Sequence, residues 1–91
     1  MPVVFARIRV GDFDRWKTAF DSHEPYRREQ GITLKAIYRD ASYWNGILVI
    51  LEAEDVEKAQ TYYSSDEQRQ RMSQSGLERP AELWIGSDVL G

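Results

Sequence analysis

Cysteine is absent from this sequence of 91 residues, so the chain can form no disulfide, no thiolate metal site and no cysteine nucleophile. A chain without cysteine suits a reducing compartment, and we expect the protein in the cytoplasm. Long hydrophobic runs are also missing, because the longest unbroken aliphatic run, residues 47–51, is far too short to span a bilayer. The first ten residues contain no basic, apolar leader. We therefore expect neither export nor insertion into a membrane.

An excess of positive charge is lacking too. Lysine and arginine number 12 and the acidic residues 15, and the resulting net charge of -3 argues against a general binder of nucleic acid or anionic membranes. The sequence has no glycine-rich phosphate loop and no serine nucleophile motif. Four aspartates are explained by helix starts rather than by a metal-ligand cluster: Asp12, Asp14, Asp55 and Asp66. We expect no metal and no cofactor.

Hydrophobic and aromatic residues are plentiful. Hydrophobic residues make up 42% of the sequence, and proline occurs only three times, which is typical of a folded chain. A chain of this length buries about 60 to 65% of the surface that its unfolded form exposes, enough for one modest core. We expect residues 1–91 to form a single domain.

The spacing of apolar residues predicts six elements. In chain order they are a strand at 3–10, a helix at 12–31, strands at 32–39 and 46–53, a helix at 55–76 and a strand at 81–90. This βαββαβ order is that of ferredoxin-like folds of the α+β class, in which a four-stranded antiparallel sheet carries its helices on one face. In this topology the first strand lies between the third and the fourth, and the second lies beside the third.

Both helical regions carry signals of an interruption. Pro25 predicts a kink or a break near His23, because proline removes an amide donor and crowds the preceding turn. Ser65 and Gln68 have the spacing of a capping box and predict a new helical start. Asp12 is a good N-cap for the first helix.

The second face of the predicted sheet is too apolar to meet water. Residues 47–51 are apolar on both alternations, and Phe5, Ile37 and Trp84 fall opposite the apolar set of their strands. Since the chain has no element left to cover this face, we expect a second copy to cover it. The predicted assembly is a homodimer whose sheets pack face to face as a dimeric α/β barrel.

The charged residues of that second face have two explanations. Six are expected there: Arg7, Arg9, Lys35, Arg39, Glu52 and Glu82. The strand order predicts the first two arginines between the two glutamates, with the other two cations beyond. Such an alternation of sign favours cross-strand pairs that set the register. The alternative is a barrel that binds an anion.

His23 and Arg27 are the sharpest candidates for chemistry. A helical spacing of four residues points both side chains the same way, and the arginine would lower the pKa of the histidine. A neutral imidazole could then take a proton from a phenol or from a carbon beside a carbonyl. The alternative is structural: His23 caps the broken helix end, and Arg27 pairs with Glu24 or Glu29.

Large side chains at helical and strand positions could line an aromatic pocket. They are Trp16, Phe20, Tyr38, Tyr63, Met72 and Trp84. Plain core packing would explain each of them as well. Tyr43 and Trp44 stand in the predicted hairpin loop, where they either rim a pocket mouth or reach across to the partner subunit.

One pattern runs through nearly the whole chain. It comprises DFDRWKTAFDSH at 12–23, then Arg27, Gly31, Tyr38, Arg39, Asn45, Asp55, Ala59, Ser65, Met72, Gly76 and Pro80. This pattern resembles the small dimeric α/β-barrel proteins related to the antibiotic biosynthesis monooxygenases, many of which are labelled only as cyclases or as uncharacterised. The superfamily includes cofactor-independent oxygenases, polyketide cyclases, haem-degrading enzymes, muconolactone isomerases and stress-response proteins.

The resemblance implies a pocket between helices and sheet in each subunit and does not name its ligand. We expect the pocket to bind a small aromatic or polyketide-like molecule. One function open to it is a cofactor-independent monooxygenase or cyclase, with His23 as base and Arg27 or Tyr38 steadying an enolate or phenolate oxygen. The other is a non-catalytic binding or stress-related protein. Haem-degrading relatives use a histidine of the second helix, and residues 55–76 contain none, so haem is disfavoured, although His23 could serve.

Overall fold

The computed structural model of the protein describes residues 1–89, which form eight helices and strands. In chain order they are β1 (Val3–Arg9), α1 (Phe13–Ser22), α2 (Glu24–Glu29), β2 (Ile32–Arg39), β3 (Gly46–Ala53), α3 (Val56–Ser64), α4 (Asp66–Gln74) and β4 (Glu82–Gly86). The predicted order is confirmed, with each helical region divided in two. The last strand is shorter than the predicted 81–90, and Leu90 lies outside the described residues. None of these helices is long and apolar enough to cross a membrane.

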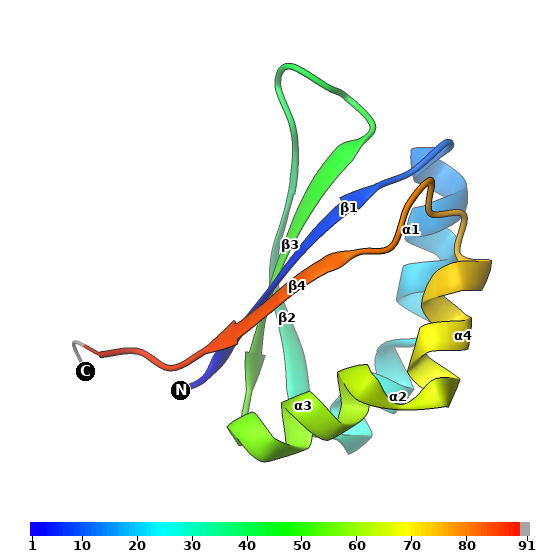
Figure 1. Cartoon of the computed structure of the whole chain (residues 1–91). Coiled ribbons are helices and arrows are strands. Elements are labelled where there is room, and N and C mark those ends of the chain that lie inside the picture. Colours follow the sequence, from blue (N-terminus) through cyan, green and yellow to red (C-terminus); the bar gives the residue numbers. More distant parts are fainter. Residues whose placement is uncertain (90–91) are drawn as a thin grey trace.

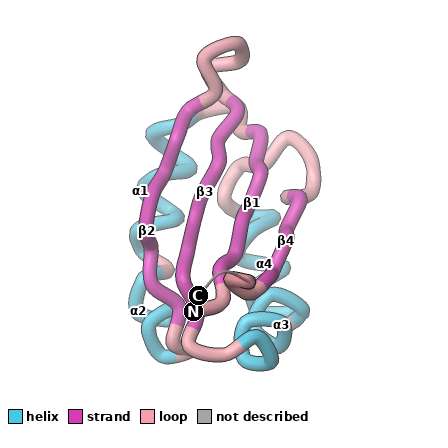
Figure 2. Tube along the Cα trace, turned by 90° about the vertical axis from the view of Figure 1, so that its left-hand side faces the viewer, coloured by secondary structure: helices cyan, strands magenta, loops and turns pink. Residues whose placement is uncertain are grey.

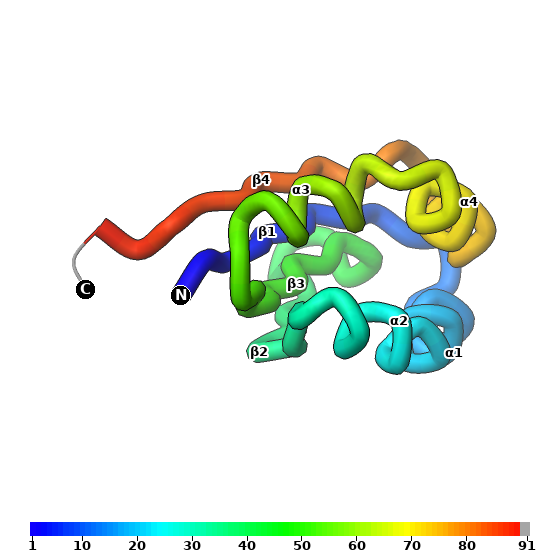
Figure 3. The backbone as a smooth tube through the Cα atoms, turned by 90° about the horizontal axis from the view of Figure 1, so that it is seen from below, coloured from blue at the N-terminus to red at the C-terminus, as the bar shows by residue number. Residues whose placement is uncertain are grey.

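The four strands form one antiparallel sheet in the order β2-β3-β1-β4, as predicted. All four helices lie on one side of it (Figure 1). Figure 2 shows the strands side by side, with the β2–β3 hairpin extending beyond the sheet at one end. Seen from below, α1 and α2 lie toward β2, whereas α3 and α4 lie toward β4 (Figure 3). The ferredoxin-like architecture is therefore confirmed.

The hydrophobic core lies between the sheet and the helices. Its buried members are Val4, Ala6, Ile8, Val10, Trp16, Ile32, Ile47, Val49, Leu51, Ala53, Ala59 and Tyr62. Alternate residues of β1 and β3 belong to this set, as a sheet with one covered face requires. Trp16 is 2% exposed and stacks on Phe20, with ring centroids 5.0 Å apart. These aromatic rings anchor α1 on the sheet.

The two helical regions are interrupted where the sequence predicted. His23 lies between α1 and α2, and Pro25 stands in the first turn of α2, where a missing amide breaks no helical hydrogen bond. Ser65 lies between α3 and α4, and its hydroxyl accepts a hydrogen bond from the Gln68 backbone N–H at 3.2 Å. Asp12 caps α1 in the same way. The predicted break and both caps are confirmed.

A β-bulge in β2 changes which residues face the helices. Leu34 pairs with Leu51, whereas Ala36 pairs with Ile50, so Lys35 is an extra residue between the two pairs. An inserted residue interrupts the regular alternation of a strand, so every side chain beyond it moves to the other face.

The faces predicted for the second half of β2 are therefore wrong. Ile37 was expected on the second face, but it packs against the core, and Arg39 lies opposite Ile47 on the helix side. Ala36 and Tyr38 take the open face instead. Side chains alternate between the two faces of a strand only while the strand pairing is regular. The sequence itself gives no sign of the extra residue in β2.

The open face carries a row of apolar side chains that crosses the whole sheet. Its members are register partners, one from each strand: Ala36, Ile50, Phe5 and Trp84. The Phe5 and Trp84 rings lie 5.4 Å apart, and Trp84 is 58% exposed. Within residues 1–89 no helix covers this row (Figure 1).

The charged side chains of the open face follow a different pairing from the predicted one. Arg7 lies beside Glu82 as expected, but Arg9 and Glu52 stand at opposite ends of the β1–β3 ladder, so their predicted proximity is wrong. Glu52 pairs instead with Lys35 at 3.0 Å. Neither Arg7 nor Arg9 takes part in an ion pair of the described residues.

Gly31 follows α2 with a φ of 71°, a left-handed backbone that disfavours a Cβ atom. A Cβ there would also lie 2.7 Å from Glu54 Oε2. We expect Gly31→Ala to lower the free energy of unfolding by about 1 kcal/mol in urea titrations. Gly11→Ala is the matched control, because a Cβ at Gly11 meets nothing within 4 Å, and it should change stability by less than about 0.5 kcal/mol. Equal effects would contradict the conformational requirement.

Candidate functional site

A cavity of about 40 Å³ lies between the sheet and the helices, at the break between α1 and α2. Its floor is apolar and comes from the helix-facing residues of β1 and β3: Ala6, Ile8, Val49 and Leu51. Its walls come from all four helices and from the segment after α4. The site therefore lies where the sequence resemblance placed a pocket.

Six of the eight residues predicted for a site line this cavity. They are Trp16, Phe20, His23, Arg27, Tyr63 and Met72. The other two, Tyr38 and Trp84, lie on the open face, where each is 58% exposed. The sheet separates them from His23, so the structure does not bring them to this cavity.

Arg27 is buried in the cavity wall without an ion-pair partner among residues 1–89; burial lowers its pKa, and the carboxylates of Glu24 and Asp21 raise it without contacting it. Its side chain is 4% exposed, its guanidinium lies 3.8 Å from the centroid of the Phe20 ring, and Nη1 donates a hydrogen bond to Phe20 O at 2.8 Å. Among the described residues it forms no ion pair, either with Glu29 or with Glu24, which pairs with Arg28 at 2.9 Å. A buried charge is normally paired. The guanidinium is therefore available to an anionic group in the cavity.

His23 ends α1 with its backbone and lines the cavity with its side chain. Its N–H donates to Phe20 O at 3.2 Å, and the imidazole makes no capping hydrogen bond. Burial lowers the pKa of His23, and the nearby cations Arg71 and Arg27 lower it further. The imidazole is neutral near pH 7 and can accept a proton. The structure does not show the alternative in which this side chain caps the helix.

Two tyrosines of α3 place phenols beside these cations. The Tyr62 and Tyr63 rings meet edge to face, 5.0 Å apart. Burial raises the pKa of both phenols, although Arg27 acts in the opposite direction, so both stay protonated near neutral pH. The Tyr62 hydroxyl is buried without a close hydrogen-bond partner among the described residues, although Arg71 lies near enough to lower its pKa. Tyr63 lines the cavity, whereas Tyr62 does not, so this hydroxyl lies outside the cavity wall.

The sequence interpretation missed two polar residues of the wall, Gln68 and Ser75, each 6% exposed. Gln68 serves the predicted cap through its backbone, which leaves its side chain to line the cavity. The helical spacing could have indicated both residues. Gln68 lies four residues before Met72 and Ser75 three residues after it, so all three share one helical face.

A larger cleft lies behind the cavity wall. It measures about 600 Å³, lies between α4 and β4, and shares Tyr63, Met72 and Leu77 with the cavity. The cavity alone is smaller than the roughly 150 Å³ that accommodates benzene, whereas the cleft has the volume of an ordinary small-molecule site. Met72 has an unbranched and flexible side chain, so it is the shared residue that moves aside most easily.

The cavity does not suit a metal or a haem. Within residues 1–89 no three His, Cys, Asp or Glu side chains are grouped so that they could hold a metal ion. Haem would need a space many times larger than the roughly 40 Å³ beside His23. The cavity as it stands therefore holds neither a haem nor any other aromatic ligand unless Met72 is displaced.

Solved structures match this chain along nearly its whole length, although no protein-family model and no curated protein does. A candidate antibiotic biosynthesis monooxygenase from Bordetella bronchiseptica superposes with a TM-score of 0.77 at 14% identity, covering 98% of this chain and 97% of that one. A mutant of SnoaB, a cofactor-independent oxygenase from Streptomyces nogalater, gives 0.73 at 14% identity, covering 99% and 95%. A candidate antibiotic biosynthesis monooxygenase from Nitrosomonas europaea gives 0.67 at 17% identity, covering 98% and 99%.

These likenesses show the fold. The chain has the ferredoxin-like fold of the antibiotic biosynthesis monooxygenase-like proteins, as the pattern of residues predicted.

The lowered pKa of His23 predicts a pH dependence of stability. The folded protein binds the His23 proton less readily than the unfolded chain, whose histidine has a pKa near 6.5. The neutral His23 side chain therefore makes its full contribution to the free energy of unfolding above pH 6.5. This contribution is lost as the pH falls below that value and the unfolded chain takes up the proton. We expect His23→Gln to lose less stability than the wild type between about pH 7 and 5.5 in urea unfolding. A wild type that gains stability over this range relative to the variant would show that the pKa is raised.

Proposed function

We propose that this chain, as a single domain in a homodimer, binds a small aromatic or polyketide-like molecule between helices and sheet and oxidises it with dioxygen without a cofactor. The proposal includes a cytoplasmic location, which rests on the absence of cysteine. One observation carries the assignment of the site: Arg27 is 4% exposed, faces the cavity and has no carboxylate partner among residues 1–89.

The proposed chemistry begins with a proton transfer to His23. The neutral imidazole takes the proton from a phenol or from a carbon beside a carbonyl, and the resulting oxyanion faces the Arg27 guanidinium. Dioxygen adds to the electron-rich carbon, a proton completes the hydroperoxide, and loss of water leaves a new carbonyl group. Each turnover consumes one dioxygen and releases one water. Trp16 and Phe20 supply the aromatic wall on which the ring of the ligand rests.

The size of the cavity sets a condition on this proposal. Because the roughly 40 Å³ beside His23 holds only one or two water molecules, the ligand must reach it from the neighbouring cleft by displacing Met72. The same small volume favours the second candidate, a non-catalytic protein whose cavity is simply well-filled core. A cyclase would use the same proton transfer but would consume no dioxygen.

The test is a screen of aromatic polyketides and hydroquinones under air, with dioxygen uptake and product mass as readouts. We expect His23→Gln to lower kcat by about 100-fold or more and Arg27→Met by a similar factor, because each removes a group that acts on the developing anion. Arg28→Gln is the matched control: it loses the same charge from the same helix, but its side chain pairs with Glu24 outside the cavity. It should leave turnover unchanged.

Stability measurements on the same variants separate catalysis from folding. Arg27→Met should keep or raise the melting temperature, because it replaces an unpaired buried charge with an apolar chain of similar length. Unchanged turnover in His23→Gln would remove the proposed base. Cyclised products without dioxygen uptake would identify a cyclase, and no conversion by the wild type would favour the non-catalytic candidate.

The homodimer is proposed from the open face of the sheet. Its apolar row contains Phe5 and Trp84, and neighbouring Leu48 is 36% exposed, a larger apolar surface than a sheet face normally shows to water. The occupant we propose is the same face of a second copy, because a two-fold axis brings the same patch of both copies together. The sequence resemblance supports the same assembly.

Light scattering tests the dimer. We expect about twice the monomer mass for the wild type at micromolar concentration, and a monomer for Ile50→Lys, which places a charge in the centre of the apolar row. Thr61→Lys adds the same charge on the exposed surface of α3 and should remain a dimer. A wild-type monomer, or dissociation of both variants, would contradict the face-to-face arrangement.

A further inference from the structure

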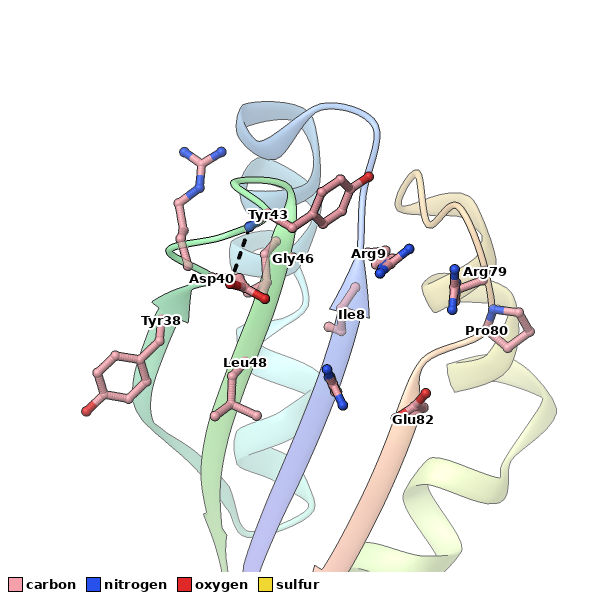
Figure 4. Close-up of a pocket in the computed structure, with 13 residues that line it drawn as sticks. Ile8, Arg9, Tyr38, Asp40, Tyr43, Gly46, Leu48, Arg79, Pro80 and Glu82 are labelled. Atoms are coloured by element: carbon pink, nitrogen blue, oxygen red, sulfur yellow. Dashed lines mark hydrogen bonds between the residues drawn. The ribbon is translucent and has the colours of Figure 1, made fainter.

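A second hollow lies on the face of the sheet opposite to His23. It measures about 560 Å³ and lies at the hairpin end of the open face, between the β2–β3 hairpin and the loop before β4 (Figure 4). We propose that this hollow binds the oxyanion of a small organic acid, a carboxylate or a phosphate carried on a planar apolar body. The site is separate from the cavity of the proposed function and rests on neither His23 nor Arg27.

Four arginines line the hollow: Arg7, Arg9, Arg39 and Arg79. Arg39 takes no part in the proposed binding, since its Nε donates to Trp44 O at 2.9 Å and its guanidinium lies on the helix side, 4.1 Å from the centroid of the Phe13 ring. The side chains of Arg7 and Arg79 form no ion pair or hydrogen bond within residues 1–89, and Arg9 only stacks over the Tyr43 ring at 4.7 Å. Figure 4 shows Arg9, at the end of β1, and Arg79, in the loop before β4, projecting into the same space.

The carboxylates in the hollow do not neutralise these cations. Asp40 accepts two backbone N–H bonds of its own turn, from Ser42 at 2.7 Å and from Tyr43 at 3.3 Å. Glu82 lies opposite Arg7 in the register without forming an ion pair. Arg7, Arg9 and Arg79 together with the two carboxylates leave a formal charge of +1 here, in a protein whose net charge is -3. Guanidinium groups match carboxylate and phosphate oxygens with two parallel hydrogen bonds, so an oxyanion is the favoured ligand.

Apolar and aromatic side chains beside the arginines define the rest of the ligand. Leu48 forms part of the floor, and Pro80 and Tyr43 stand at the sides (Figure 4). The Tyr43 hydroxyl donates to Glu78 Oε2 at 3.2 Å, which fixes the ring in place. A few charged groups beside fixed apolar walls are typical of a small-molecule site of this volume. The walls suit a planar body such as an aromatic ring.

The hollow adjoins the apolar row without coinciding with it. Phe5 belongs to the row, whereas Arg7 and Arg9 lie two and four residues further along β1, toward the hairpin. A second copy packed on the row would leave Arg9 and Arg79 at the margin of the interface. The proposed dimer would cover Leu48, which the hollow shares with that face, and would leave Arg9 and Arg79 accessible to the ligand.

Calorimetric titration of the intact protein tests the site, with phenyl phosphate, benzoate, inorganic phosphate and benzyl alcohol as probes. We expect saturable binding of phenyl phosphate, benzoate or both, weaker at higher salt, and none for benzyl alcohol. Arg7→Gln and Arg79→Gln should each weaken binding by about 10-fold. Arg15→Gln removes the same charge from the helix side and should stay within about twofold of wild type.

The relative affinities of phenyl phosphate and benzoate show which oxyanion the site prefers, and either preference supports the proposal. The proposal is overturned if neither binds, if inorganic phosphate binds as tightly as phenyl phosphate, or if Arg15→Gln weakens binding as much as Arg79→Gln. It is also overturned if Arg7→Gln and Arg79→Gln only dissociate a dimer that binds no anion, because the arginines would then serve the interface.

Discussion

The contact between the Arg27 guanidinium and Phe20 is the interaction on which the candidate site depends. It joins α2 to the last turn of α1 through a ring contact at 3.8 Å and a hydrogen bond at 2.8 Å. A cation over an aromatic ring contributes about 0.5 to 2 kcal/mol and a charged hydrogen bond about 1.5 to 3 kcal/mol, whereas burying the charge costs several kcal/mol. Together these contacts contribute about 2 to 5 kcal/mol, which is comparable with that cost. An anionic ligand would add the ion pair that residues 1–89 do not supply to Arg27.

The helix break at His23 and Pro25 makes this contact possible. The last turn of α1 contains no basic residue, and its carbonyl groups form the negative end of the helix dipole. Because the chain turns at His23, α2 brings Arg27 back to Phe20 O, a carbonyl of that turn. The cation that interacts with the negative C-terminal end of α1 therefore comes from the next helix, α2. The same turn directs the His23 imidazole into the cavity rather than along the helix surface.

Most of the fold could be predicted from the sequence, because its signals are local. Alternation, caps and Pro25 are each decided by a few neighbouring residues, and they predicted the strand order and both helix interruptions. The bulge at Lys35 could not be predicted, since it depends on how two strands far apart in the sequence pair. For the site, the helical spacing of His23 and Arg27 was informative, whereas the missing counter-charge of Arg27 becomes visible only when every nearby carboxylate is placed.

That single inserted residue in β2 also decides the chemistry of both faces. With a regular strand, Tyr38 would lie on the helix side and could steady an anion there together with Arg27. The bulge turns Tyr38 to the open face and Arg39 to the helix side, where it stacks on Phe13 at 4.1 Å. The cavity is thus left with one unpaired cation, and a ligand held there needs one anionic oxygen. The fold separates this buried charge from the exposed arginines on the other face of β1 by placing the sheet between them.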